Sequence, residues 1–93
     1  MTAKHYFQVD VPTWSAAQPE RQGRHIFTGS ADDGRQAVRL ARRVCEATLA
    51  ARAAGEPLPR RSPDGWGARG VRPGWELDWA AATVVPWRHN RLL

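Results

Sequence analysis

Residues 30–57 read SADDGRQAVRLARRVCEATLAARAAGEP, which is the clearest helix signal in the chain. Ser30 and Asp33 have the spacing of a capping box, with an aspartate in place of the usual glutamate. The two consecutive aspartates at this point also favour the positive end of a helix dipole. Gly55, followed by Pro57, is typical of the place where a helix ends. Together these residues predict one long helix over residues 31–54.

The predicted helix is strongly amphipathic. At about 100° per residue, its apolar and small side chains fall on one stripe, and its arginines collect on the opposite side with Glu46. The stripe consists of Ala37, Val38, Leu40, Ala41, Val44, Cys45, Thr48 and Leu49. The opposite side holds Arg35, Arg39, Arg42 and Arg43. The stripe therefore predicts the face that packs on the rest of the domain.

Two segments before the helix have the pattern of strands. In residues 5–11, apolar Phe7, Val9 and Val11 alternate with polar neighbours, which is typical of a half-buried strand, and we expect it to end at Pro12. Residues 24–28 are rich in β-favouring side chains and predict a second strand. The two strands would pair as a hairpin across a long polar loop at residues 13–23.

The segment after the helix predicts a loop and then more strands. Residues 55–74 hold five glycines and four prolines, so we expect a flexible loop. Residues 75–79 alternate apolar and acidic side chains, residues 83–85 are β-favouring, and Pro86 marks an edge strand. The element order ββαβ, or ββαββ, predicts an α+β fold. A small, mainly antiparallel sheet would be covered on one face by the helix.

The chain of 93 residues predicts a single domain, residues 1–93, with a thin core. Leu, Ile, Val and Phe account for 16 residues, and five tryptophans add large apolar side chains. Self-association into a homodimer is a second way to complete such a core. The core residues that we predict are Val9, Val11, Ile26, Leu40, Val44, Leu49, Leu77 and Trp79.

The net charge, the apolar runs and the cysteine content predict the kinds of partner and the location of the protein. The formal net charge is +5, and the basic excess lies in residues 35–61, which favours anionic partners. No run is long and apolar enough to predict a membrane span, so we expect no membrane partner. Residues 1–7 lack the apolar core of a signal peptide, and a single cysteine fits a reducing compartment. The expected location is the cytoplasm.

Catalytic and metal chemistry find no support in the sequence. The three histidines and Cys45 lack metal-ligand spacing, and Cys45 lies in the apolar stripe, where we expect a buried structural thiol. Residues 65–70 match GxGxxG, but Pro63 precedes them and Pro73 follows, so the strand and helix of a dinucleotide site are missing. No trio of nucleophile, base and orienting group emerges. We therefore predict no enzyme activity, no metal and no cofactor.

Two groups of basic residues are candidate sites for nucleic acid or another anion. Arg35, Arg39, Arg42 and Arg43 present four cations on one helix face. That face has an ordinary alternative, in which Asp32 and Glu46 pair with these arginines. Arg60, Arg61, Arg69 and Arg72 surround Trp66 in the loop, an arrangement suited to stacking a base beside phosphate contacts. The alternative there is a connecting loop whose tryptophan is tucked onto the core.

A family resemblance adds a further expectation. A Gly-Ser pair leads into the acidic helix start, Ala37 and Ala41 recur along the helix, and Gly-Glu-Pro-Leu-Pro follows at residues 55–59. In these features, residues 26–62 resemble the core of HicB-type antitoxins of bacterial toxin–antitoxin pairs. The resemblance implies a small sheet-and-helix domain that binds and blocks a small RNA-cleaving toxin, often as an oligomer. It does not extend to the family's C-terminal DNA-binding region.

Taken together, these patterns predict a non-catalytic binding module. The leading hypothesis is a HicB-like module that binds a protein partner, in an interaction of the toxin–antitoxin type. The alternative is a small basic accessory protein that binds nucleic acid with the arginine face of its helix. The resemblance favours the protein partner, whereas the charge distribution is what keeps nucleic acid open.

Overall fold

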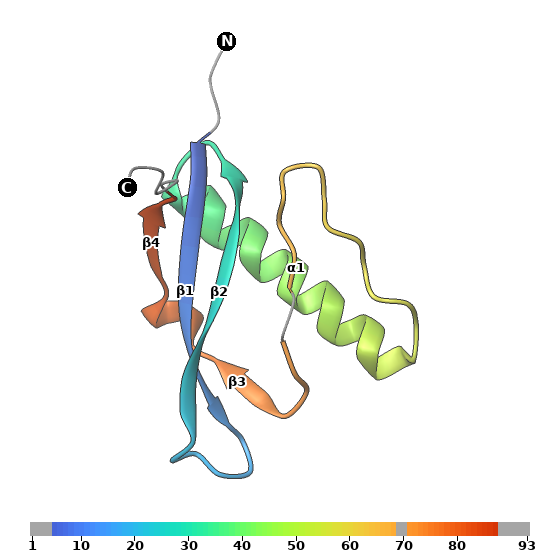
Figure 1. Ribbon diagram of the computed structural model, residues 1–93. Coiled ribbons are helices and arrows are strands. Elements are labelled where there is room, and N and C mark those ends of the chain that lie inside the picture. The colour runs from blue at the N-terminus through green and yellow to red at the C-terminus, as the bar shows by residue number, and fades with distance from the viewer. Residues whose placement is uncertain (1–4, 69–70, 88–93) are drawn as a thin grey trace, which may run out of the picture.

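A computed structural model describes residues 5–68 and 71–87 and shows an α+β fold with the order ββαββ (Figure 1). Its four strands form one antiparallel sheet, and its helix crosses one face of that sheet. The elements are β1 (His5–Ser15), β2 (Gln22–Ala31), α1 (Gly34–Ala54), β3 (Trp75–Leu77) and β4 (Thr83–Pro86), with a 3₁₀ turn at Trp79–Ala81. The predicted fold class is confirmed.

β1 is the central strand, and it does not end at Pro12 as predicted. On one side it pairs with β2 along almost its whole length. On the other side it pairs with β4 up to Asp10 and with β3 from Thr13 onward. Pro12 falls in the gap between these partners, where its carbonyl oxygen accepts the backbone N–H of Asp78 (2.9 Å). The missing N–H of Pro12 therefore breaks no ladder bond, and the strand continues to Ser15.

The hairpin is longer than predicted, and this moves the start of the helix. β2 includes Ser30 and Ala31, and the connecting loop shrinks to residues 16–21. The predicted cap at Ser30 is therefore wrong. Asp33 caps α1 instead, because its carboxylate accepts the backbone N–H of Gln36 (2.8 Å). The predicted end is confirmed at Gly55, which adopts the left-handed conformation (φ 69°).

The core lies between α1 and the sheet face that α1 covers. Strand residues Val9, Val11 and Phe27 are buried there against the small stripe residues Ala37, Ala41 and Cys45 of α1. The predicted core residues that are partly buried against this cluster are Leu40, Val44, Leu49, Leu77 and Trp79.

Ile26 is the predicted core residue that the structure contradicts. Its side chain is 58% exposed. Phe27 pairs with Val9 and shares the helix-covered face, and alternation along a strand then turns its neighbour Ile26 outward.

The described part of the segment after α1 is a loop up to β3, as predicted, and it supplies residues to the core. Trp66 and Val71 are fully buried, and Trp66 is only 1% exposed. The indole packs on the backbone of Gly29, and its Nε1–H donates to the carbonyl oxygen of Ser30 (2.8 Å). Figure 1 shows this segment beside α1, on the β2 side of the sheet, and its residues Trp66 and Val71 belong to the same buried cluster as those of the strands and the helix.

Candidate binding surfaces

Three of the four predicted helix arginines line one groove between α1 and β4. Arg35, Arg39 and Arg42 follow the spacing i, i+4 and i+7, which places them along one side of a helix. The groove has a volume of about 530 Å³, and its lining is completed by Gly34, Val38 and Val84. Arg43 is exposed and does not line it. We call this feature the α1–β4 groove.

The charges in the α1–β4 groove are only partly neutralised. Arg42 pairs with Glu46 over 3.1 Å between Nε and Oε2, which confirms the predicted intrahelical pair. The predicted pair of Asp32 with Arg35 is not among the ion pairs of the described residues. The side chain of Gln36 accepts the backbone N–H of Asp32 instead (2.6 Å). Among the described residues, Arg35 and Arg39 form no ion pair, and they therefore contribute positive charge beside two valines.

The predicted loop arginines do not gather around Trp66. The Trp66 ring is buried, so it is not available to stack on a base while this packing holds. Arg61 lines a second groove of about 480 Å³ at the C-terminal end of α1, together with Thr48, Arg52, Leu58, Pro59, Gly67 and Ala68. Sequence reasoning missed Arg52, although it lies one turn beyond the stripe residue Thr48.

The other three loop arginines lie apart from this second groove. The guanidinium of Arg72 lies 4.8 Å from the ring centre of Trp75, in a cation–π contact. Arg60 is exposed. Arg69 lies outside the described residues. The described part of the loop therefore does not assemble the candidate base-stacking site, and the burial of Trp66 agrees with the alternative in which the tryptophan is tucked onto the core.

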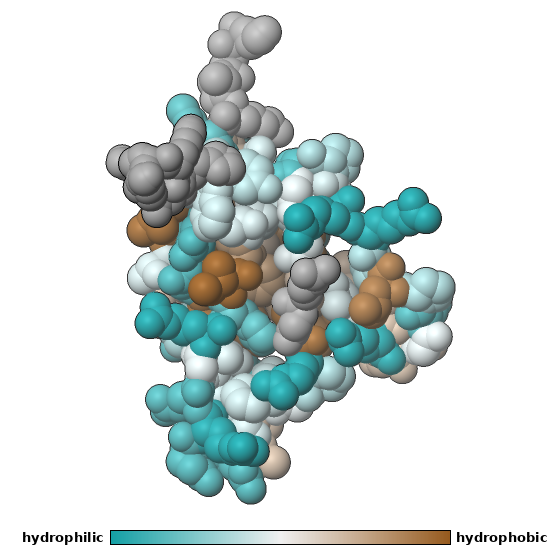
Figure 2. All heavy atoms as spheres, in the orientation of Figure 1, coloured by the Kyte–Doolittle hydropathy of each residue, from teal (hydrophilic) through white to brown (hydrophobic). Residues whose placement is uncertain are grey.

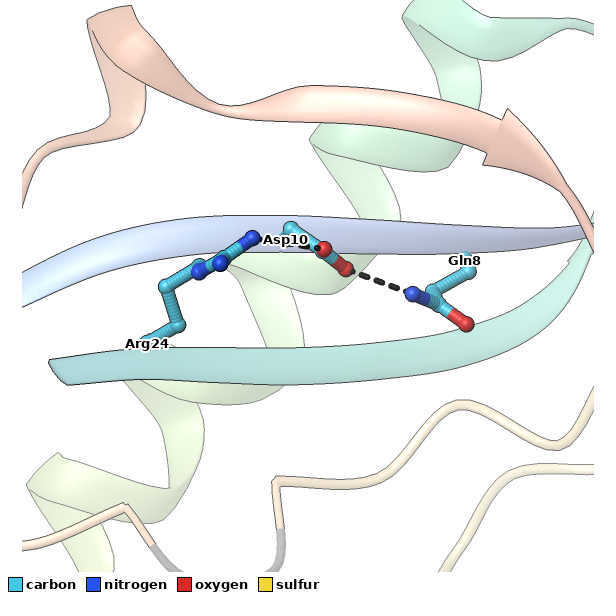
Figure 3. A network of polar contacts seen from close by, with 3 residues as sticks. All are labelled: Gln8, Asp10 and Arg24. Carbon is cyan, nitrogen blue, oxygen red and sulfur yellow. Dashed lines mark hydrogen bonds and ion pairs between the residues drawn. The ribbon is translucent and has the colours of Figure 1, made fainter.

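The sheet face turned away from α1 is largely polar at its centre. Asp10 accepts a hydrogen bond from the side chain of Gln8 (2.8 Å) and forms an ion pair with Arg24 (3.6 Å), as Figure 3 shows. Apolar side chains flank this network: Val85 on β4, Ile26 on β2, and Tyr6 on β1, whose hydroxyl lies against Gly65 of the loop. Figure 2 shows this face, with separate hydrophobic patches on a mostly hydrophilic surface.

Two titratable groups among the described residues, Cys45 and His25, have shifted pKa values. Burial, and secondarily the nearby charge of Glu46, raise the pKa of the Cys45 thiol to about 11. The cysteine is buried, as expected, and its raised pKa is the opposite of the lowered pKa that a nucleophilic thiol needs. Burial, and then the charge of Arg72, lower the pKa of His25. Within the described residues, no cluster of three or more His, Cys, Asp or Glu side chains has the geometry to hold a metal ion.

The comparisons with known proteins leave the chain without an assigned relative. A scan against protein-family models and searches of curated proteins and of solved structures found no significant match. Among the described residues, no helix combines the length and the apolar character that crossing a bilayer requires.

Proposed function

We propose that this chain is a non-catalytic, HicB-like binding module and that the α1–β4 groove holds a segment of a protein partner. The observation that carries this proposal is the composition of the groove. Arg35 and Arg39 supply positive charge that no ion pair within residues 5–68 and 71–87 offsets, and Val38 and Val84 supply apolar surface next to it. A complementary segment has carboxylates beside apolar side chains, which is the character of an acidic amphipathic stretch of protein.

The same composition favours protein over nucleic acid. Nucleic acid binds a basic surface mainly through its charged phosphates, which gain little from the two valines. One of the three groove arginines is already engaged by Glu46. The resemblance to HicB-type antitoxins independently supports a protein partner of the toxin–antitoxin type.

Nucleic-acid binding is the second candidate, and one observation favours it. Arg39 and Arg43 are both exposed on α1, and the chain carries a formal net charge of +5. In that case phosphates would meet the whole arginine face rather than the groove alone. The two candidates therefore differ in the arginines that contact the partner: a protein segment in the groove contacts Arg39 but not Arg43, whereas nucleic acid contacts both.

The test begins with the full chain immobilised at about 150 mM salt, where the screening length is about 8 Å. A random peptide library displayed on phage is panned against it. We expect the enriched peptides to combine Asp or Glu with Leu, Ile or Phe. Enrichment of peptides without acidic residues, or no enrichment, contradicts the proposal.

The dissociation constant of an enriched peptide is then measured for matched variants. Arg39→Glu reverses a charge in the groove, and Arg43→Glu makes the same change outside it. We expect Arg39→Glu to weaken binding by at least about tenfold and Arg43→Glu by less than about twofold. Val38→Thr, which keeps the shape of the side chain, is expected to weaken binding a few-fold through its hydroxyl. Equal effects of the two charge reversals would point to general attraction instead.

A further inference from the structure

Over most of its length, the outer edge of β2 has no backbone hydrogen bond to any other described residue. At Ser30 the edge is closed, because the backbone N–H donates to the carbonyl oxygen of Asp64 (2.8 Å) and the carbonyl accepts the indole of Trp66. Ser30 therefore points its backbone groups away from β1. By the alternation of an antiparallel ladder, Arg24, Ile26 and Thr28 do the same. No backbone hydrogen bond formed among the described residues uses the outward groups of these three.

This edge lacks the features that usually protect edge strands. Native proteins place Lys, Pro, inward charges or bulges on exposed edges to prevent pairing with another chain. Residues 22–28 contain no Lys, Pro or acidic residue, and the one arginine, Arg24, is paired with Asp10. Ile26 stands at the centre of the open stretch and is 58% exposed. The opposite edge, at β4, is four residues long and carries Pro86.

We infer that β2 pairs antiparallel with β2 of a second copy of this chain, centred on Ile26, and joins the two sheets into one. In this register Ile26 meets its own copy, and Arg24 on each copy meets Thr28 of the other. All three residues point their backbone groups outward, so each can exchange hydrogen bonds with its partner. The contact is two-fold symmetric and closes after two chains.

Neighbouring registers are less favourable for identifiable reasons. A centre at Arg24 sets two like charges directly opposite each other, which destabilises a sheet. A centre at Thr28 needs the backbone groups of Ser30, which are already bonded to Asp64 and Trp66. A centre at His25 places Ile26 beside Arg24 and separates the two exposed isoleucines. A centre at Phe27 places Arg24 opposite Ser30, whose backbone groups are already bonded. Among the registers centred on Arg24, His25, Ile26 and Thr28, only the Ile26 register places two apolar side chains opposite each other at the axis.

The first experiment measures the mass of the full chain by sedimentation equilibrium from about 5 µM to about 500 µM, a range that covers weak interfaces. We expect a concentration-dependent dimer. Ile26→Lys should raise its dissociation constant by at least about tenfold, because it adds a charge that faces its own copy. Val85→Lys is the matched control, since Val85 lies on the same sheet face and is 48% exposed. It should leave the dimer unchanged, and circular dichroism verifies that both variants fold.

The second experiment fixes the register by disulfide trapping in the full chain. Residues in a hydrogen-bonded antiparallel pair have Cα atoms about 5.5 Å apart, which is within disulfide reach. Ile26→Cys should therefore form a covalent dimer faster than Val85→Cys. The native Cys45 is 1% exposed and does not compete. A monomer at all concentrations, a dimer indifferent to Ile26→Lys, or faster trapping with His25→Cys would each overturn the inference.

Discussion

Gly29 shows how a single residue fixes the path of the chain after α1. It lies opposite Phe7 on the covered face of β2, and the indole of Trp66 packs directly against its backbone. A Cβ at this position would fall inside the Trp66 ring, far closer than van der Waals contact allows. Because Trp66 is held by the core and by its hydrogen bond to Ser30, it has no free direction in which to move.

Gly29→Ala is therefore expected to destabilise the protein by about 1–3 kcal/mol, the usual cost of overpacking a filled core. Guanidinium unfolding measures the loss. Gly23→Ala is the matched control in the same strand, because a Cβ there meets Thr13 Cγ2 at an ordinary 3.9 Å. We expect that control to change stability by less than about 0.5 kcal/mol. Equal losses in the two variants would show that Trp66 does not pack on Gly29.

His25 gives the protein a pH dependence with a definite sign. Its pKa is lowered in the folded state by burial and then by the charge of Arg72. The unfolded chain, with a histidine pKa of about 6.5, therefore binds the proton more readily than the folded chain. The contribution of His25 is fully present above the unfolded pKa and is lost as the pH falls through that value toward the lowered folded pKa.

We expect urea unfolding of the wild type to show lower stability near pH 5.5 than near pH 7.5. His25→Gln removes this titration and should flatten that part of the profile. Arg72→Gln removes the second cause, so NMR titration should find the His25 pKa closer to its ordinary value. A His25 pKa unchanged by Arg72→Gln would rule out the electrostatic contribution, and a higher pKa in wild type than in a peptide would reverse the predicted sign.

At the level of elements, the start of α1 can be tested directly. Ser30 and Asp33 both have the chemistry of a cap, and they compete at the same end of the helix. The sheet decides between them, because Ser30 pairs with Tyr6 in the β1–β2 ladder. Asp33 is then left to accept the N–H of Gln36.

Asp33→Ala is expected to cost about 1 kcal/mol of folding free energy through the lost cap. Ser30→Ala should cost much less, because the structure uses the backbone groups of Ser30, which alanine keeps. Thermal unfolding of the two variants distinguishes the two caps. A larger loss for Ser30→Ala would return the helix start to the position that the sequence favoured.

Local sequence pattern was sufficient where the deciding interactions are local. The stripe of α1, its end at Gly55 and the clustering of Arg35, Arg39 and Arg42 all follow from helical periodicity. The pattern failed where a distant partner decides. Pro12 continues β1 because the gap between β3 and β4 lies beside it, which no window around residue 12 contains.

The strand positions in β2 failed for a related reason. Ile26 and Phe27 are adjacent and equally β-favouring, so only the pairing of Phe27 with Val9 shows which of them faces α1. The sequence also left open whether the Trp66 ring is exposed or packed on the core, and a distant partner decides this as well. Composition placed four arginines near Trp66 along the chain, but the path of the backbone buries the ring and sends Arg61 and Arg72 to different neighbours.

At the scale of the whole molecule, the way the thin core is completed is connected with the place where the positive charge lies. The covered sheet face needs more apolar cover than the small residues of α1 provide, and the segment with Trp66 and Val71 supplies it. The outer side of α1 therefore does not have to pack against the core, and it carries the exposed arginines. The surface available to a partner is consequently basic at the α1–β4 groove and uncharged at the centre of the open β2 edge.

This division predicts how the protein responds to a short generic DNA duplex in an NMR titration. Exposed arginines attract phosphates at low salt, so we expect small amide shifts spread over residues 35–43. At about 150 mM salt, where the screening length falls to about 8 Å, these shifts should vanish, because salt screens the attraction and the valines of the groove add nothing that binds a phosphate. Arg39→Glu and Arg43→Glu should reduce the low-salt shifts alike. Shifts that persist at the higher salt would make nucleic acid the partner. If the shifts are lost, the groove is distinguished by peptide binding, which Arg39→Glu should weaken far more than Arg43→Glu.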